Sequence, residues 1–267
     1  MSEARVALVT GAARGIGAAT VRALVEQGYR VVAVDSCAGD GERRPAGVAY
    51  ALATPADLLA VAAEAGTSVV TQVADVRDRA ALDAAAALAV EQFGRLDAVV
   101  AAAAVIAGGA PLWQTPDDQL QTLWQVDVQG VWNTAAACVP LMLAGPDPGN
   151  CRFVALASAA GTHGLFHLAA YTAAKHAVVG LVKGLAADLV GTGVTATAVS
   201  PGSTRTAMLH ATAALYGHEG VEHFADSQLV QRLIEPAEIA ATIAFCCSPA
   251  GGVLNGSVVH ADGGFAP

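Results

Sequence analysis

The chain has 267 residues, of which 54% are hydrophobic and 14% are charged, and its formal net charge is −9. This length and apolar content predict one folded domain with a large core and exclude an intrinsically disordered protein. The acidic balance argues against nucleic acid as a partner, because proteins that bind polyanions carry basic surfaces.

Short runs of β-branched residues alternate with longer helical segments along the chain. We expect strands at 5–10, 30–35, 68–73, 97–103, 152–157, 194–199 and 257–260, and helices at 15–28, 55–65, 79–93, 116–144, 170–190 and 236–246. Such alternation predicts βαβ units, and the nearly continuous apolar strands indicate a buried parallel sheet. The predicted class is therefore α/β: a single Rossmann-type domain over residues 1–267, with a doubly wound, mostly parallel seven-stranded sheet.

Two connecting segments are unusually long. Residues 36–53 follow the second strand, and residues 203–231 follow the sixth. Both lie at the carboxyl ends of strands, where open α/β sheets bind ligands. We expect the second segment to form a lid over the substrate, with an apolar wall of Met208, Leu209, Leu215, Tyr216 and Phe224.

A glycine-rich turn, TGAARGIG at 10–17, joins the first strand to the first helix. Gly11 permits a tight turn, Gly15 lets a pyrophosphate approach the backbone, and Gly17 allows the helix to pack closely on the strand. The free N–H groups and the dipole at the start of the helix attract phosphate. The strand–turn–helix context predicts a dinucleotide site, with a simple reversal of the chain as the alternative.

Asp35 ends the second strand, 18 residues after Gly17. A carboxylate here can accept hydrogen bonds from the ribose hydroxyls of adenosine, and it repels a 2′-phosphate. We therefore expect NAD rather than NADP. The candidate partners for a 2′-phosphate, which keep NADP open, are Arg14, Arg43 and Arg44.

Three residues form a candidate catalytic group. Ser158 follows the fifth strand, Tyr171 comes 13 residues later, and Lys175 lies one helical turn beyond it. A phenol has an ordinary pKa of about 10, and a neighbouring ammonium lowers that pKa and favours the phenolate. Ser158 can then hold a substrate oxygen while Tyr171 exchanges its proton. The alternative is a surface Tyr–Lys pair.

With these residues the chain resembles the short-chain dehydrogenase/reductase family over essentially its whole length. The motifs that carry the resemblance are TGAARGIG at 10–17, Asp35, Asp75-Val76, Ser158, Tyr171-x-x-x-Lys175, PGSTRT at 201–206 and DGG at 262–264. The resemblance implies hydride transfer between an alcohol or carbonyl carbon and nicotinamide. It implies Tyr171 as the acid/base, Lys175 as phenolate stabiliser and ribose ligand, and a homotetramer built on the helices near 116–144 and 170–190.

The resemblance also implies the contacts with the cofactor. Asp75 and Val76 flank the adenine, while the backbone of Thr204 and the hydroxyl of Thr206 hold the carboxamide. The complete expected set is Gly11, Arg14, Gly15, Ile16, Gly17, Asp35, Asp75, Val76, Ala102, Ala103, Tyr171, Lys175, Pro201, Gly202, Thr204 and Thr206. Three residues between Tyr171 and Lys175 argue against the enoyl-reductase branch, which has six.

The chain departs from the family pattern after the fourth strand and in the long helix. Ala101–Ala104 replace the usual Asn-Asn-Ala-Gly. Asp127 stands where the family has an Asn that helps to hold a water between the lysine and solvent. We include Asp127 among the catalytic candidates: it can act through its backbone or pair with Lys175, and the alternative is that it faces elsewhere.

A third departure is the extra length at 36–53. With ALATPADL at 51–58, this segment is similar to the mycofactocin-coupled branch of the family. That similarity implies an NAD that stays bound and is reoxidised in place by an external redox carrier, mycofactocin. The alternative is a surface insertion with no role in the site.

The expected function is NAD-dependent oxidation of a small hydrophobic secondary alcohol, or reduction of its ketone. The alternatives are an ordinary family member that exchanges NAD(P)(H) freely and a non-catalytic NAD-binding sensor or scaffold. His163 and His167 are expected to line the pocket, and the spacing of His210, His218 and His223 predicts no metal site.

The five cysteines have no disulfide or metal spacing, and the uncharged stretches are broken by Gly, Pro or hydrogen-bonding residues. The N-terminal residues lack the pattern of a signal peptide. We therefore expect a cytoplasmic protein with no membrane partner.

Overall fold

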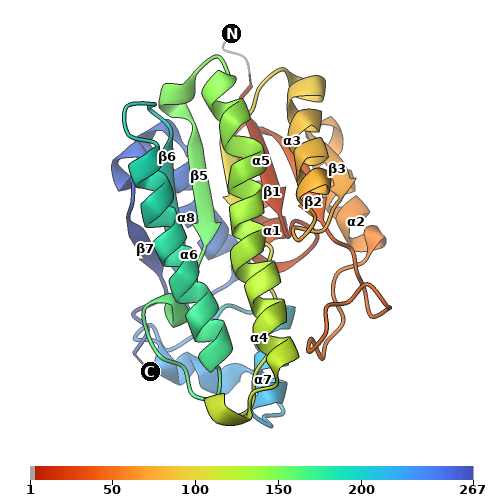
Figure 1. Ribbon diagram of the computed structural model, residues 1–267, viewed down its shortest axis with the longest axis vertical. Coiled ribbons are helices and arrows are strands. Elements are labelled where there is room, and N and C mark those ends of the chain that lie inside the picture. Colours follow the sequence, from red (N-terminus) through yellow and green to blue (C-terminus); the bar gives the residue numbers. More distant parts are fainter. Residues whose placement is uncertain (1–3, 267) are drawn as a thin grey trace.

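The computed structural model describes residues 4–266, which form a parallel sheet between two layers of helices (Figure 1). The strand order is β3-β2-β1-β4-β5-β6-β7, and all neighbouring pairs are parallel. The strands are β1 (Val6–Thr10), β2 (Arg30–Asp35), β3 (Val69–Val73), β4 (Ala98–Ala101), β5 (Arg152–Leu156), β6 (Thr195–Pro201) and β7 (Val258–Ala261). This confirms the predicted seven-stranded, doubly wound fold. The order reverses between β1 and β4, the place where such sheets bind ligands.

The helices divide between the two faces of the sheet. They are α1 (Gly15–Glu26), α2 (Pro55–Ala65), α3 (Arg79–Phe93), α4 (Asp117–Leu123), α5 (Gly130–Ala144), α6 (Ala169–Asp188), α7 (Ala207–Leu215) and α8 (Pro236–Cys247). In β1, Val6 and Leu8 pack with α3, α5 and α6, whereas Ala7 and Val9 pack with α1, α2 and α8. Successive side chains of a strand point to opposite faces, so β1 contributes to both cores.

Local sequence explains where α2 begins. The Thr54 hydroxyl accepts a hydrogen bond from the Asp57 backbone, the Asp57 carboxylate accepts one from the Thr54 backbone, and Pro55 occupies the first turn. This reciprocal cap satisfies amide groups that the helix itself leaves unpaired.

The predicted helix over 116–144 is not one regular α-helix. A π-helical turn over Trp124–Gln129 separates α4 from α5. Such a turn takes in an extra residue, which the apolar periodicity does not reveal, and it often marks a functional position. Here it carries Asp127.

The two long connections lie at the carboxyl ends of the strands. The 36–53 segment leaves the sheet after β2 as an irregular excursion (Figure 1). Thr122 Oγ1 links it to α4 by donating a hydrogen bond of 2.7 Å to the Ala46 carbonyl. The 203–231 segment contains α7 and a short 3-10 helix over Glu222–Ser227. Within residues 4–266, every helix falls short of the length and apolarity that a membrane span requires.

Candidate active site

A cavity of about 670 Å³ opens at the carboxyl ends of the strands. Every residue expected to contact the cofactor lines this cavity, and so does Ser158. The residues come from the glycine turn, from the ends of β2, β4, β5 and β6, and from α6, because parallel strands bring their carboxyl ends to one edge of the sheet. Asp127 is instead fully buried.

The glycine turn is held tightly against its neighbours. A Cβ atom on Gly11 would lie 2.8 Å from the backbone of Ala103, and one on Gly17 would lie 2.0 Å from the Gly11 carbonyl oxygen. Arg14, the residue before α1, makes no capping hydrogen bond with its side chain in the described part of the chain. The first amide groups of α1 are therefore available to an anion in the cavity.

Asp35 is fixed at the end of β2 by two backbone amides. Its Oδ2 accepts a hydrogen bond of 3.1 Å from Ala13, and its Oδ1 accepts one of 3.0 Å from Cys37. Arg14 lines the same cavity, but its guanidinium donates to the Ala51 carbonyl at 2.8 Å. Arg43 donates to the Cys37 carbonyl. Two of the three arginines that kept NADP open are thus engaged by the protein backbone.

Ser158, Tyr171 and Lys175 meet in the cavity. Ser158 lies just after β5 and hydrogen-bonds with the Tyr171 side chain. Lys175 lies one turn further along α6, with Nζ 5.6 Å from the centre of the Tyr171 ring and 3.2 Å from the Leu156 carbonyl to which it donates. A phenol, a second hydroxyl and a cation therefore lie together at one place in the cavity.

Asp127 pairs with Lys175, one of the arrangements left open by the sequence. Its Oδ2 lies 3.2 Å from Lys175 Nζ, and its Oδ1 accepts a hydrogen bond of 2.9 Å from the Val105 amide. Both side chains of the ion pair are buried, Asp127 completely and Lys175 to within 2%. The carboxylate therefore lies behind the cavity wall, against the lysine.

The pKa of Tyr171 lies above its usual value, because burial outweighs the expected lowering by Lys175. Burial raises it most, Lys175 lowers it as expected, Asp127 raises it, and the hydrogen bond from Ser158 lowers it. Burial lowers the pKa of Lys175, but Asp127 and Tyr171 together raise it by more than burial lowers it. The pKa of Lys175 is therefore also above its usual value. The sequence pattern shows the cation beside the phenol and gives no sign of the burial that opposes it.

Tyr50 is a cavity residue that the sequence analysis missed. It belongs to the 36–53 segment, and its hydroxyl accepts a hydrogen bond of 3.2 Å from the Ile106 amide. The Arg14 guanidinium lies 5.6 Å from the centre of its ring. Burial raises the pKa of Tyr50 to about 12. The sequence signal that could have identified Tyr50 is an aromatic residue directly before the 51–58 motif.

The lid residues are placed largely as expected. Met208, Leu209, Tyr216 and Phe224 line the cavity, whereas Leu215 packs outside it. The described lining includes His218 and His223 rather than His163 and His167, so that part of the prediction is wrong. His163 instead lies close to the Ala159 carbonyl, and His167 stacks on Phe166. Within residues 4–266, no three His, Cys, Asp or Glu side chains are grouped as metal ligands.

Comparison with known proteins defines the class. A family model described as "Enoyl-(Acyl carrier protein) reductase" matches residues 11–266. The chain belongs to this family of short-chain dehydrogenases/reductases, which are oxidoreductases.

Individual relatives are similar over most of the chain. An uncharacterized NAD-dependent oxidoreductase of Mycobacterium tuberculosis is 36% identical over 270 residues, covering 97% of this chain and 95% of the relative. (−)-trans-Carveol dehydrogenase of Rhodococcus erythropolis is 34% identical over 243 residues, covering 90% and 83% of the two chains. The crystal structure of carveol dehydrogenase from Mycobacterium avium in complex with NAD matches with a TM-score of 0.89 and 28% identity, covering 98% and 97%.

Proposed function

We propose that the protein transfers a hydride between a small hydrophobic secondary alcohol, or its ketone, and NAD, with Ser158, Tyr171 and Lys175 as the catalytic residues. The observation that carries the proposal is the meeting of these three side chains in the same cavity as the glycine turn. The spacing of Tyr171 and Lys175 supports an alcohol dehydrogenase rather than an enoyl reductase. The experiment that tests this function is replacement of Tyr171 by Phe, which should slow alcohol oxidation and leave NAD bound.

The residues of the cavity fit NAD. The amides at the start of α1 suit the pyrophosphate, and no side chain could replace hydrogen at Gly17 without meeting the backbone. The Asp35 carboxylate suits the ribose hydroxyls, Asp75 and Val76 the adenine, and Thr204 and Thr206 the carboxamide. When bound, NAD supplies the hydride acceptor or donor.

The protein itself handles the proton and the substrate oxygen. Tyr171 accepts the hydroxyl proton in alcohol oxidation and returns it in ketone reduction, while Ser158 hydrogen-bonds with the substrate oxygen. Lys175 stabilises the phenolate by its charge. The apolar side chains of Met208 and Phe224 line the cavity and favour a hydrophobic substrate such as a terpenoid or alicyclic alcohol. The names of the two carveol dehydrogenases support that choice.

The 36–53 segment supports an NAD that stays bound. It is fastened to the glycine turn by Arg14, to the chain after β4 by the Tyr50–Ile106 hydrogen bond, and to α4 by Thr122. These contacts hold residues of the segment against the cavity, and a cofactor bound there would be released more slowly while they stay closed. We therefore include in the proposal that the bound NADH is reoxidised in place by an external redox carrier of the mycofactocin type. Free exchange of NAD is the second candidate.

Removing the Tyr50 side chain tests retention of the cofactor. We expect wild-type protein, purified without added cofactor and dialysed, to release on denaturation an amount of NAD equal to the amount of chain. Tyr50→Ala should release much less, because both the hydrogen bond to Ile106 and the contact with Arg14 are lost. Glu42→Ala changes an exposed residue of the same segment and should match wild type. Little nucleotide from wild-type protein would favour free exchange and leave 36–53 as a surface insertion.

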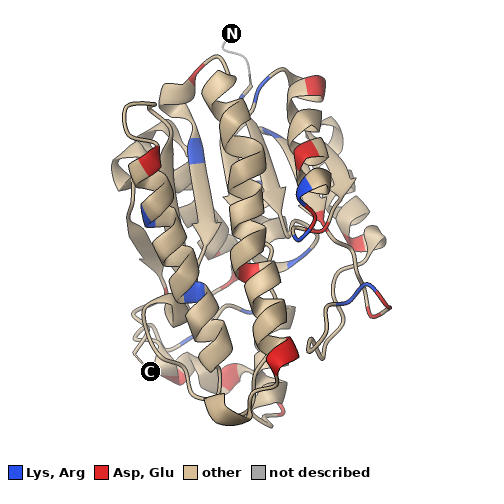
Figure 2. Cartoon of the chain, in the orientation of Figure 1, with Lys and Arg blue, Asp and Glu red and all other residues tan. Residues whose placement is uncertain are grey.

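The face formed by α5 and α6 supports a homotetramer. Charged residues are sparse there (Figure 2), and α5 contains none. Trp124 is 51% exposed and Trp132 is 64% exposed, an arrangement typical of a surface that packs against another chain. We expect the mass in solution to be four times the 26.6 kDa of one chain. A measured mass equal to that of one chain would contradict the tetramer and would leave the proposed reaction unaffected.

A further inference from the structure

The ion pair behind the catalytic tyrosine is built from separate elements. Asp127 comes from the π-helical turn, Lys175 from α6, and the Val105 amide from the chain after β4. The hydrogen bond from Val105 fixes Asp127 Oδ1. Asp127 Oδ2 faces the Lys175 ammonium at 3.2 Å. The carboxylate is thus held in place and directed at the lysine.

We propose that Asp127 is a positioning residue that acts through Lys175 and sets the pH at which Tyr171 exchanges its proton. This inference rests on the proposed function of Tyr171. Asp127 is fully buried and outside the cavity lining, so its effect on a substrate is indirect. An ammonium with a carboxylate beside it has little net charge, and it attracts a phenolate less than an unpaired ammonium does.

Four groups face Tyr171 from the elements packed around it. They are Lys175 on α6, Asp127 on the π-helical turn, Ser158 after β5 and Tyr50 from the 36–53 segment. Lys175 and Ser158 favour the phenolate, whereas Asp127 opposes it. The pKa of Tyr50 is raised to about 12, so this phenol carries no charge near neutral pH. Asp127 is therefore the group that opposes Lys175.

Asp127→Asn tests the inference because Asn keeps the shape and the acceptor for Val105 but loses the charge. The rate of alcohol oxidation rises with pH as Tyr171 loses its proton. In Asp127→Asn, Lys175 faces Tyr171 without a neighbouring carboxylate, so we expect this rise to move to lower pH by about one unit. Ketone reduction, which needs the protonated phenol, should begin to fall at a correspondingly lower pH. An unmoved profile, or one moved to higher pH, would overturn the proposal.

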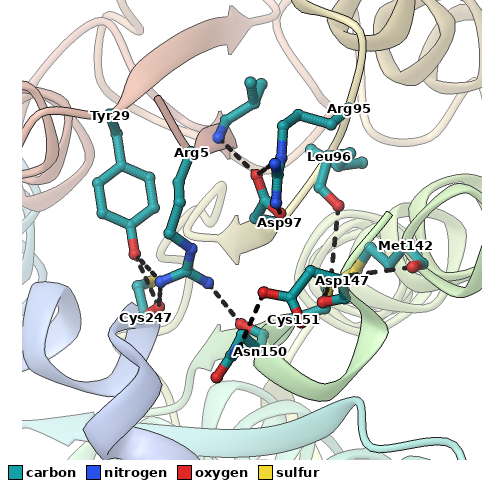
Figure 3. A network of polar contacts seen from close by, with 11 residues as sticks. Arg5, Tyr29, Arg95, Leu96, Asp97, Met142, Asp147, Asn150, Cys151 and Cys247 are labelled. Carbon is teal, nitrogen blue, oxygen red and sulfur yellow. Dashed lines mark hydrogen bonds and ion pairs between the residues drawn. The ribbon is translucent and has the colours of Figure 1, made fainter. Parts of the chain in front are cut away.

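Asp97→Asn is the matched control (Figure 3). Asp97 lies just before β4, away from the carboxyl ends of the strands. Its carboxylate is also buried, pairs with Arg95 at 2.6 Å and accepts a hydrogen bond of 2.8 Å from the Val6 amide. Both variants lose one charge of a buried ion pair, and both should unfold at lower temperature. Only Asp127→Asn should move the pH profile. An equal shift in Asp97→Asn would indicate a general effect of lost stability.

A titration that needs no turnover keeps the test independent of the proposed function. NMR of tyrosine labelled at the hydroxyl-bearing ring carbon, assigned with Tyr171→Phe, follows the phenol directly. In wild-type protein we expect Tyr171 to titrate above the ordinary value of about 10, and in Asp127→Asn at a lower pH than in wild type. If Tyr171 titrates at the same pH in wild type and in Asp127→Asn, or in Asp127→Ser should the Asn variant not fold, the role of Asp127 is overturned. Such a result would leave the catalytic role of Tyr171 standing.

Discussion

Tyr171→Phe is expected to slow alcohol oxidation by a factor of about 10² to 10⁴ while leaving NAD bound. The substitution removes one hydroxyl and keeps the ring, which is buried against α6 and the core. The group that exchanges the proton with the substrate is lost, whereas the glycine turn and Asp35 are untouched. Steady-state rates with a redox dye as acceptor, together with the nucleotide content of the purified protein, measure the two effects separately.

Tyr216→Phe is the control for that substitution. Tyr216, in the lid, also lines the cavity, and its hydroxyl donates a hydrogen bond of 2.6 Å to the Phe166 carbonyl, between β5 and α6. Its loss should change substrate affinity modestly and leave the chemistry intact. Full activity in Tyr171→Phe would refute the proposed mechanism. Wild-type protein that binds NAD and oxidises no alcohol would favour the sensor or scaffold alternative.

Gly17→Ala is expected to lower the free energy of unfolding by about 1–3 kcal/mol and to abolish most NAD binding. The new methyl group would lie 2.0 Å from the Gly11 carbonyl oxygen and 2.7 Å from its carbon, so backbone atoms have to move apart. That movement displaces the start of α1, where the pyrophosphate amides lie. Thermal unfolding and nucleotide content report the two losses.

Gly184→Ala adds the same methyl group where space is open. Gly184 lies in α6, and nothing is within 4 Å of the position that its Cβ would take. Alanine favours a helix over glycine by about 1 kcal/mol, so stability should hold or rise, with NAD binding unchanged. If Gly17→Ala behaved in the same way, the tight approach of the turn to α1 would have no importance for the cofactor.

Much of the architecture could be predicted because local signals and topology agree. Apolar runs marked the seven strands, and Thr54-Pro55 marked the start of α2 at the residue where the structure begins it. Parallel strands then bring the glycine turn, Asp35 and Ser158 to one edge without any further information. The π-helical turn was missed because one additional residue within a long apolar helix hardly changes its periodicity.

The features that were missed depend on three-dimensional packing. The pairing of Asp127 with Lys175 depends on how the π-helical turn rotates the helix, so the sequence left three possibilities open. The raised pKa of Tyr171 depends on burial, which outweighs the neighbouring cation. Tyr50 reaches the cavity only because an irregular segment folds back over it, and such segments have no periodic pattern to identify a buried position.

Transfer of deuterium from the alcohol to the cofactor is the most direct test of hydride transfer at the Ser158–Tyr171–Lys175 site. The wild-type protein is mixed with cyclic secondary alcohols, including carveol, that carry deuterium on the hydroxyl-bearing carbon. It is then denatured, and the released cofactor is analysed by mass spectrometry, which works whether NAD exchanges or stays bound. We predict deuterated NADH from wild-type protein and almost none from Tyr171→Phe in the same time. No deuterium in the cofactor with any of these alcohols, or an equal amount from both proteins, would contradict the account.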